Sequence, residues 1–230
     1  MLVDCARSMW AFPLIGAFIG LLAGGFGWVA YHFMSSSLVI GALVLALLLL
    51  ITGLHHTDGL LDFGDGVMAH GSAEHKIEVM HDKFTGAGGL VLGIMTILIT
   101  ALAFGQLYSG ILLLEAVIVV ELSAKLAMVV AARAGKSVHE GMNTSFLQAM
   151  HGRGGNWRLV AALIISFVIA FLLLQWAGVI TVLISVLTGL IMVEVAHKHF
   201  HGVTGDVFGA TNELARMVCV VVLLAVVVWV

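Results

Sequence analysis

Long apolar runs fill most of this chain, and they constrain its fold more than any other feature. Hydrophobic residues make up 61% of the 230 residues, charged residues make up 10%, and the mean hydropathy is +1.15. A soluble domain typically carries about 25% charged residues. A run of about 20 apolar residues is long enough to cross the hydrocarbon core of a bilayer as a helix. The sequence therefore predicts an all-α, polytopic integral membrane protein whose partner is the lipid bilayer.

Seven apolar runs are candidate membrane-spanning helices, in one transmembrane domain that covers residues 1–230. The fifth and sixth runs are separated only by residues 176–177, which predicts a tight hairpin. The last run has only 14 residues, so we expect it to be tilted or inserted part of the way. The seven runs are residues 10–31, 37–54, 87–104, 111–132, 159–175, 178–195 and 217–230.

The lysines and arginines predict the orientation of the chain, because cytoplasmic loops of membrane proteins are enriched in both. With seven spans and a cytoplasmic N-terminus, nine of the ten fall on the cytoplasmic side of the cell (plasma) membrane. Three hydrophilic segments, 55–86, 133–158 and 196–216, then share this face and could build one active site. The nine residues are Arg7, Lys76, Lys83, Arg133, Lys136, Arg153, Arg158, Lys198 and Arg216.

Three aspartates follow the second apolar run. In a helix, Asp58, Asp62 and Asp65 lie on one face, because they are four and three residues apart. Carboxylates that are close together repel one another unless a cation neutralises them, and hard oxygen ligands suit Mg²⁺. Such a cluster at a membrane surface is suited to binding a diphosphate. A solvated acidic loop is the alternative, and three glycines in the segment weaken the case for a continuous helix.

A further aspartate follows a predicted amphipathic helix in residues 72–84. Ser72 can cap this helix, and an apolar face runs along it to Phe84. Asp82 lies near its C-terminal end, where an acidic side chain opposes the helix dipole. A second metal site or a phosphate site would explain Asp82, and a solvent-exposed pair with Lys83 would explain it equally well.

The third hydrophilic segment contains a turn of small residues, Thr204-Gly205-Asp206. Such residues allow the backbone to approach a phosphate or an ion closely. We expect Asp206 to complete the site of the three aspartates. In the second segment, Arg133 at the end of the fourth apolar run could hold phosphate oxygens.

Charged side chains inside the predicted spans need partners, because a lipid-facing charge is costly. Glu121 and Lys125 are four residues apart on a helix, and we interpret them as a mainly structural pair. The chain has no basic patch with interleaved aromatic residues, so nucleic acid is not an expected partner. A homo-oligomer is compatible with the sequence.

Three blocks, in this order along the chain, resemble one known family. They are residues 53–66, 78–86 and 202–213, which include Leu-His-His-Thr-Asp-Gly, Glu-Val-Met-His-Asp and Gly-Val-Thr-Gly-Asp. The blocks are similar to those of the cobalamin synthase family, the adenosylcobinamide-GDP ribazoletransferases. His81 stands where lysine is usual in that family. Residues 12–16 resemble the opening of the family's first span, and residues 133–158 resemble the family only weakly.

The resemblance implies a Mg²⁺-dependent membrane enzyme of the last steps of vitamin B12 biosynthesis. It would join adenosylcobinamide-GDP to α-ribazole or its 5′-phosphate, forming adenosylcobalamin or its phosphate and releasing GMP. The implied metal ligands are Asp58, Asp62, Asp65, Asp82 and Asp206. The implied catalytic residues are His56, Asp82 and Asp206, and the expected substrate-binding residues are Arg133, Thr204 and Gly205.

Two alternative functions remain open from the residues alone. A CDP-alcohol-type lipid phosphotransferase also uses aspartates at a membrane surface, usually as Asp-Gly-x-x-Ala-Arg. Here Asp58-Gly59 is followed by Leu60-Leu61-Asp62, so that motif is absent. A divalent-metal transporter could use the eleven histidines and the aspartates. A transporter is expected to hold its ligands near the middle of the membrane, whereas these acidic residues lie at the ends of predicted spans.

Overall fold

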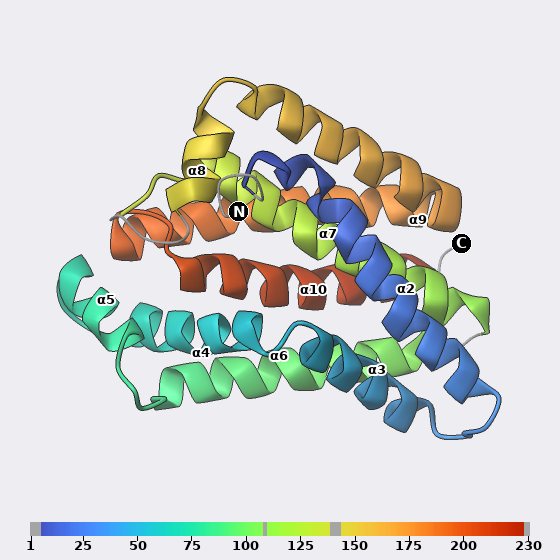
Figure 1. Cartoon of the computed structure of the whole chain (residues 1–230). Helices are drawn as coiled ribbons and strands as arrows, with labels where there is room; N and C mark the ends of the chain where they lie inside the picture. The colour runs from blue at the N-terminus through green and yellow to red at the C-terminus, as the bar shows by residue number, and fades with distance from the viewer. Residues whose placement is uncertain (1–5, 108–109, 139–143, 228–230) are drawn as a thin grey trace.

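The protein is all-α in residues 6–107, 110–138 and 144–227, which are the parts that the computed structural model describes (Figure 1). Its helices pack lengthwise into one bundle, and a short 3-10 helix precedes the first long helix. The elements are η1 (Met9–Ala11), α2 (Phe12–Tyr31), α3 (Ser37–Ile51), α4 (His55–Met68), α5 (Ala73–Met80), α6 (Ala87–Gln106), α7 (Ile111–Ala134), α8 (Thr144–His151), α9 (Gly155–Phe200) and α10 (Gly205–Val227).

Helix α7 forms the interior of the bundle, in contact with α2, α9 and α10. Most of its side chains are buried. α2 approaches α7 closely because Gly16, Gly20 and Gly24 face it. A Cβ at any of these glycines would lie 3.0 Å or less from a backbone atom of α7. Small residues four apart allow this backbone-to-backbone packing of apolar helices.

Helix α9 consists of two arms that fold back on each other, drawn in gold and orange in Figure 1. Leu174 and Gln175 have non-helical backbone angles, and Gln175 has a φ of 49°. Gly178 then packs against the carbonyl oxygen of Ala170, where a Cβ would lie only 2.1 Å from that oxygen. The tight hairpin predicted at residues 176–177 is confirmed, with its reversal two residues earlier.

Helices α3 and α4 are bent by 95° relative to each other. Gly53 and Leu54 at the break have φ values of 66° and 62°, in the left-handed region. Gly41 of α3 and Gly64 of α4 both lie against the backbone of α6, so α6 runs past the two helices in turn. α4 is one continuous helix despite its glycines, and it packs inside the bundle instead of forming a solvated loop.

Several helices are long and apolar enough to cross a membrane. Among the described residues, four segments meet this criterion, and α3 with α4 would make a fifth if the bent pair were a single span. The predicted count of seven is therefore confirmed only in part. The four segments are Met9–Tyr31, Ala87–Gln106, Gly155–Phe200 and Gly205–Val227.

The last helix is longer than the sequence predicted. α10 begins at Gly205, twelve residues before the expected start at residue 217. Arg216, expected at a cytoplasmic edge, is instead fully buried within α10. The prediction was wrong because Asn212, Glu213 and Arg216 lower the hydropathy of this segment, while in the fold their polar groups bind one another inside the bundle.

Candidate active site

A cavity of about 540 Å³ lies beside the first turns of α2, α4 and α10. All three predicted hydrophilic segments contribute to it. α4 supplies His55, His56 and Asp58, α8 supplies Phe146, and α10 supplies four residues, Gly205, Asp206, Phe208 and Gly209. The expectation that these segments come together is confirmed. The lining residues are Met9, Phe12, His55, His56, Asp58, Met128, Phe146, Gly205, Asp206, Phe208 and Gly209.

Two glycines set the approach of α4 to α10. A Cβ on Gly59 would lie 2.9 Å from the Cα of Asp206, and a Cβ on Gly209 would lie 3.0 Å from the carbonyl oxygen of His56. Both helices therefore meet backbone to backbone. This contact places Asp206 beside the helix that carries Asp58, although nearly 150 residues separate the two in sequence.

Four aspartates form an acidic cluster at this contact, namely Asp58, Asp62, Asp65 and Asp206. The negative charges of Asp206, Asp58 and Asp65 all act on the half-buried carboxylate of Asp62. Among the described residues, no lysine or arginine forms an ion pair with any member of the cluster. The charge of His81, which follows α5, acts on Asp206. In the described parts of the chain, the negative charge of the cluster is therefore opposed by His81 and by no paired lysine or arginine.

Asp65 also has a structural role that the sequence did not predict. Its two carboxylate oxygens accept hydrogen bonds from the backbone N–H groups of Gly86, at 2.6 Å, and Gly89, at 2.8 Å. Gly86 is the N-cap residue of α6. A carboxylate at a helix N-terminus satisfies free N–H groups and interacts favourably with the helix dipole. Asp65 thus joins α4 to the start of α6.

The cluster fits Mg²⁺ in the chemistry of its donors, because all of them are carboxylate oxygens. In the parts of the chain that the structure describes, no three His, Cys, Asp or Glu side chains converge as a ready-made ligand set. This arrangement is compatible with Mg²⁺, which proteins commonly hold through one or two carboxylates together with water and substrate phosphates.

His56 lies on the cavity wall beside Asp58. Its Nδ1 atom and the Oγ1 atom of Thr57 are buried, and neither has a hydrogen-bond partner among the described residues. Buried polar atoms without a partner are uncommon, and they need an explanation such as a catalytic role or a bound water. The expectation that His56 belongs to the site agrees with its position.

The segment around Asp82 only partly follows the sequence prediction. Ser72 caps α5 as expected, by accepting a hydrogen bond from the backbone N–H of His75. Hydrogen bonds from the backbone N–H of Glu74 and from Ser72 lower the pKa of the exposed Glu74 carboxylate. Phe84, however, is 85% exposed. The predicted apolar face was wrong at Phe84, because the helix ends at Met80 and the chain then turns.

Asp82 itself lies beyond α5 and is exposed. Its Oδ1 atom accepts a hydrogen bond from the backbone N–H of Phe84, at 3.2 Å, which stabilises the turn. It does not line the cavity, although its neighbour His81 is close enough to influence Asp206. The assignment of Asp82 as a metal ligand or catalytic residue stays a prediction.

The expected substrate-binding residues occupy different places. Gly205 lines the cavity, and Thr204 is buried beside it, where its hydroxyl accepts a hydrogen bond from the backbone N–H of Val207 in the first turn of α10. Arg133 does not line the cavity. Its guanidinium donates two hydrogen bonds to the side-chain oxygen of Asn156.

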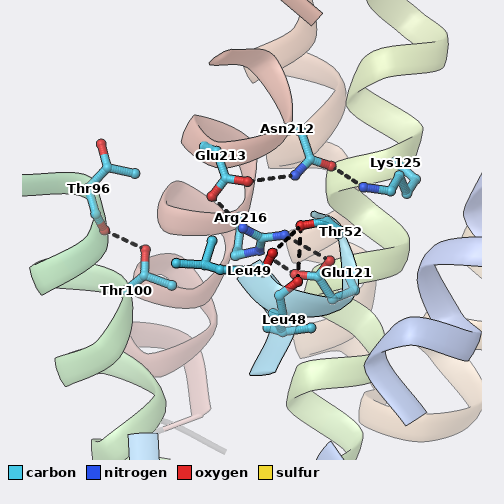
Figure 2. A network of polar contacts seen from close by, with 10 residues as sticks. All are labelled: Leu48, Leu49, Thr52, Thr96, Thr100, Glu121, Lys125, Asn212, Glu213 and Arg216. Carbon is cyan, nitrogen blue, oxygen red and sulfur yellow. Dashed lines mark hydrogen bonds and ion pairs between the residues drawn. The ribbon is translucent and has the colours of Figure 1, made fainter. Parts of the chain in front are cut away.

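A buried charged network connects α7 and α10 (Figure 2). The guanidinium of Arg216 forms ion pairs with the carboxylates of Glu121 and Glu213. Lys125 donates a hydrogen bond of 2.5 Å to the side-chain oxygen of Asn212. The direct Glu121–Lys125 pair predicted from the sequence was therefore wrong in its partners, since Arg216 takes the place of Lys125.

The charged network lies close to the cavity. Met128, one helical turn after Lys125, and Gly209, one turn before Asn212, both line the cavity wall. The positive charges of Lys125 and Arg216 also act on His56. The sequence missed this network because it placed Arg216 outside the membrane. The three-residue spacing of Glu213 and Arg216 was the available signal of a helix.

The chain is similar over nearly its whole length to proteins of one family. A family model described as cobalamin-5-phosphate synthase matches residues 2–224. The chain is 34% identical over 225 residues to the adenosylcobinamide-GDP ribazoletransferase of Thermococcus kodakarensis, covering 97% of this chain and 90% of the relative. It is 34% identical over 233 residues to the relative of the same name in Methanocella arvoryzae, covering 96% and 87%. No solved structure matches the chain.

Proposed function

The chain belongs to the cobalamin-5-phosphate synthase family and is an adenosylcobinamide-GDP ribazoletransferase, and we propose that the transfer takes place in the cavity beside the acidic cluster. The reaction joins adenosylcobinamide-GDP to α-ribazole, or to its 5′-phosphate, and completes cobalamin. One observation carries the assignment of the site: the contact of α4 with α10 brings Asp206 and Asp58 to the same cavity wall.

The chemistry is the displacement of one phosphate oxygen by another. The 3′-hydroxyl oxygen of the ribose attacks the cobinamide-side phosphorus, a new P–O bond forms, and the bond to the bridging oxygen breaks so that GMP leaves. Such a reaction depends mainly on positioning and on neutralising charge. The hydroxyl proton passes to a side chain that lines the cavity. The lining residues that can accept a proton include His56, Asp58 and Asp206.

A bound Mg²⁺ would supply the positive charge that a diphosphate needs beside four aspartates. Asp58, Asp62 and Asp206 are the residues that we propose to hold it. Asp65 adds a fourth negative charge, and it also holds the start of α6 through two hydrogen bonds. The residues of the chain act by orienting the diphosphate and excluding water. Their repulsion in the absence of a cation supports this proposal.

We place the cavity on the cytoplasmic side of the cell membrane. The support is the asymmetry of lysine and arginine, which are scarce at the opposite ends of the helices. A crossing by α7, and separate crossings by the two arms of α9, would raise the five candidate spans to seven. Family membership favours this transferase over the lipid phosphotransferase and the metal transporter.

The test is an assay of purified protein in detergent with adenosylcobinamide-GDP, α-ribazole and Mg²⁺. We expect GMP, measured by chromatography, to appear only when both substrates are present. The Asp206→Ala variant should elute normally from a sizing column and release no GMP. Normal GMP release by this variant would contradict the placement of the reaction at the α4–α10 contact.

A further inference from the structure

The cavity has two chemically different walls. One wall carries the polar groups of His55, His56, Asp58 and Asp206, at the starts of α4 and α10. The other wall is apolar and is contributed by η1, α2, α7, α8 and α10. Its residues are Met9, Phe12, Met128, Phe146 and Phe208.

The apolar wall is arranged around an aromatic pair. The rings of Phe12 and Phe146 meet edge to face, with centroids 5.9 Å apart and an interplanar angle of 66°. Met9 and Phe208, which also line the cavity, are almost completely buried. Phe208 lies two residues after Asp206, and both line the cavity, so the apolar wall continues directly into the acidic one. A ligand with one flat apolar end and one polar end would match both walls.

The size of the cavity limits which part of the substrates can enter it. Its volume of about 540 Å³ is within the range of about 300–1,000 Å³ typical of sites for drug-sized ligands. A nucleoside belongs to this size class, whereas the corrin macrocycle with its peripheral chains is much larger. The two nucleosides at the reacting diphosphate, α-ribazole and guanosine, are therefore the candidates.

The chemistry of the apolar wall separates these two candidates. Guanine carries several hydrogen-bonding groups around its edge, and burying them without partners is costly. The side chains of the apolar wall, three phenylalanines and two methionines, offer no such partners apart from weakly accepting sulfur atoms. The dimethylbenzimidazole base of α-ribazole is flat and mostly apolar, and aromatic and thioether groups pack favourably on such a ring.

We propose that the apolar wall is the binding site for the base of α-ribazole, and that Phe146 is a specificity-determining residue for that substrate. The proposal rests on the transferase function stated above. With the base on the apolar wall, the attached ribose lies at the polar wall, where its hydroxyl meets the acidic cluster. The cobinamide diphosphate then approaches from outside the cavity.

A second depression supports the assignment by contrast. It has a volume of about 310 Å³ and is lined by the side chains of Arg7, Arg153 and Arg158, together with polar and small residues. No aromatic side chain is among its described lining residues. Its chemistry suits anions and not an apolar base, in contrast to the apolar wall.

The first experiment measures steady-state constants for the two substrates separately. For Phe146→Ala we expect the KM for α-ribazole to rise about tenfold, because an aromatic contact is lost. The KM for adenosylcobinamide-GDP should stay within about twofold, because that substrate does not touch the wall. Phe33→Ala is the matched control, since Phe33 is 84% exposed and follows α2 at the opposite end of the bundle. It should leave both constants unchanged.

The second experiment measures binding to the wild-type protein, so it does not depend on the folding of a variant. Equilibrium dialysis with α-ribazole should show binding that free dimethylbenzimidazole displaces and guanosine does not. Displacement by guanosine, or a rise only in the KM for adenosylcobinamide-GDP in Phe146→Ala, would overturn the proposal while the transferase function stood. A wild-type protein that binds α-ribazole but releases no GMP from both substrates would contradict the function instead.

Discussion

Two groups of charged residues lie close together in this protein and differ in how their charges are balanced. In the network between α7 and α10, the carboxylates of Glu121 and Glu213 are matched by Arg216. In the acidic cluster, the carboxylates repel one another, and no lysine or arginine among the described residues pairs with them. The charges of the network are balanced by side chains of the protein itself, whereas the charge of the cluster needs a cation or another positive group from outside. We infer that the network holds the bundle together and that the cluster binds a ligand.

Removing Arg216 is the strongest test of this comparison. Arg216→Met removes the guanidinium that forms ion pairs with two buried carboxylates, and breaking a buried ion pair in this way costs about 3–5 kcal/mol. We expect a large fall in the thermal unfolding temperature in detergent. Neutralising both partners as well, in a triple variant with Glu121→Gln and Glu213→Gln, should recover much of the loss. A normal unfolding temperature in Arg216→Met would remove the network as a structural element.

The opposite result is expected in the acidic cluster. Asp62→Asn keeps the size of the side chain and removes one of the repelling charges, so stability should be equal to or higher than that of the wild type. Turnover should fall on the order of 100-fold, because charge that positions the diphosphate is lost. GMP release and thermal unfolding are measured on the same preparation. Glu115→Gln, in the first turns of α7 at the other end of the bundle, is the control with normal turnover.

Mg²⁺ should affect the stability of the acidic cluster and not that of the charged network. A cation that binds the folded protein raises its stability, so Mg²⁺ should raise the unfolding temperature of the wild type and have little effect on Asp62→Asn. Chelation of the metal should stop GMP release. An equal stabilisation of the two proteins by Mg²⁺ would place the binding site away from Asp62.

The smallest effect is expected at the edge of the cluster. In Asp65→Asn, an amide oxygen can still accept one of the two hydrogen bonds at the start of α6, so the loss of stability should be about 1 kcal/mol. Turnover should fall less than in Asp62→Asn if Asp65 mainly fixes α6. A loss of turnover as large as that of Asp62→Asn, with unchanged stability, would assign Asp65 to the ligand instead.

The sequence predicted those features that depend on neighbouring residues. Apolar runs predicted most of the long helices, and the four- and three-residue spacings predicted that three aspartates share a face of α4. The shared face of the hydrophilic segments and the turn of small residues at Thr204-Gly205-Asp206 predicted that Asp206 belongs with them. The partners of Arg216 and the role of Asp65 as a cap of α6 were not predictable, because both depend on how distant helices pack. The two-walled cavity was missed for the same reason, since five elements contribute to its apolar side.

The hairpin of α9 has a consequence for how the chain is inserted into a membrane. Residues 159–193, which include the reversal at Gln175, contain no Asp, Glu, Lys or Arg. The reversal itself takes only two non-helical residues, so no hydrophilic loop has to be moved through the lipid. The two arms can therefore enter the bilayer together from one side as a preformed pair. Insertion of this hairpin then requires no separate translocation of a charged segment.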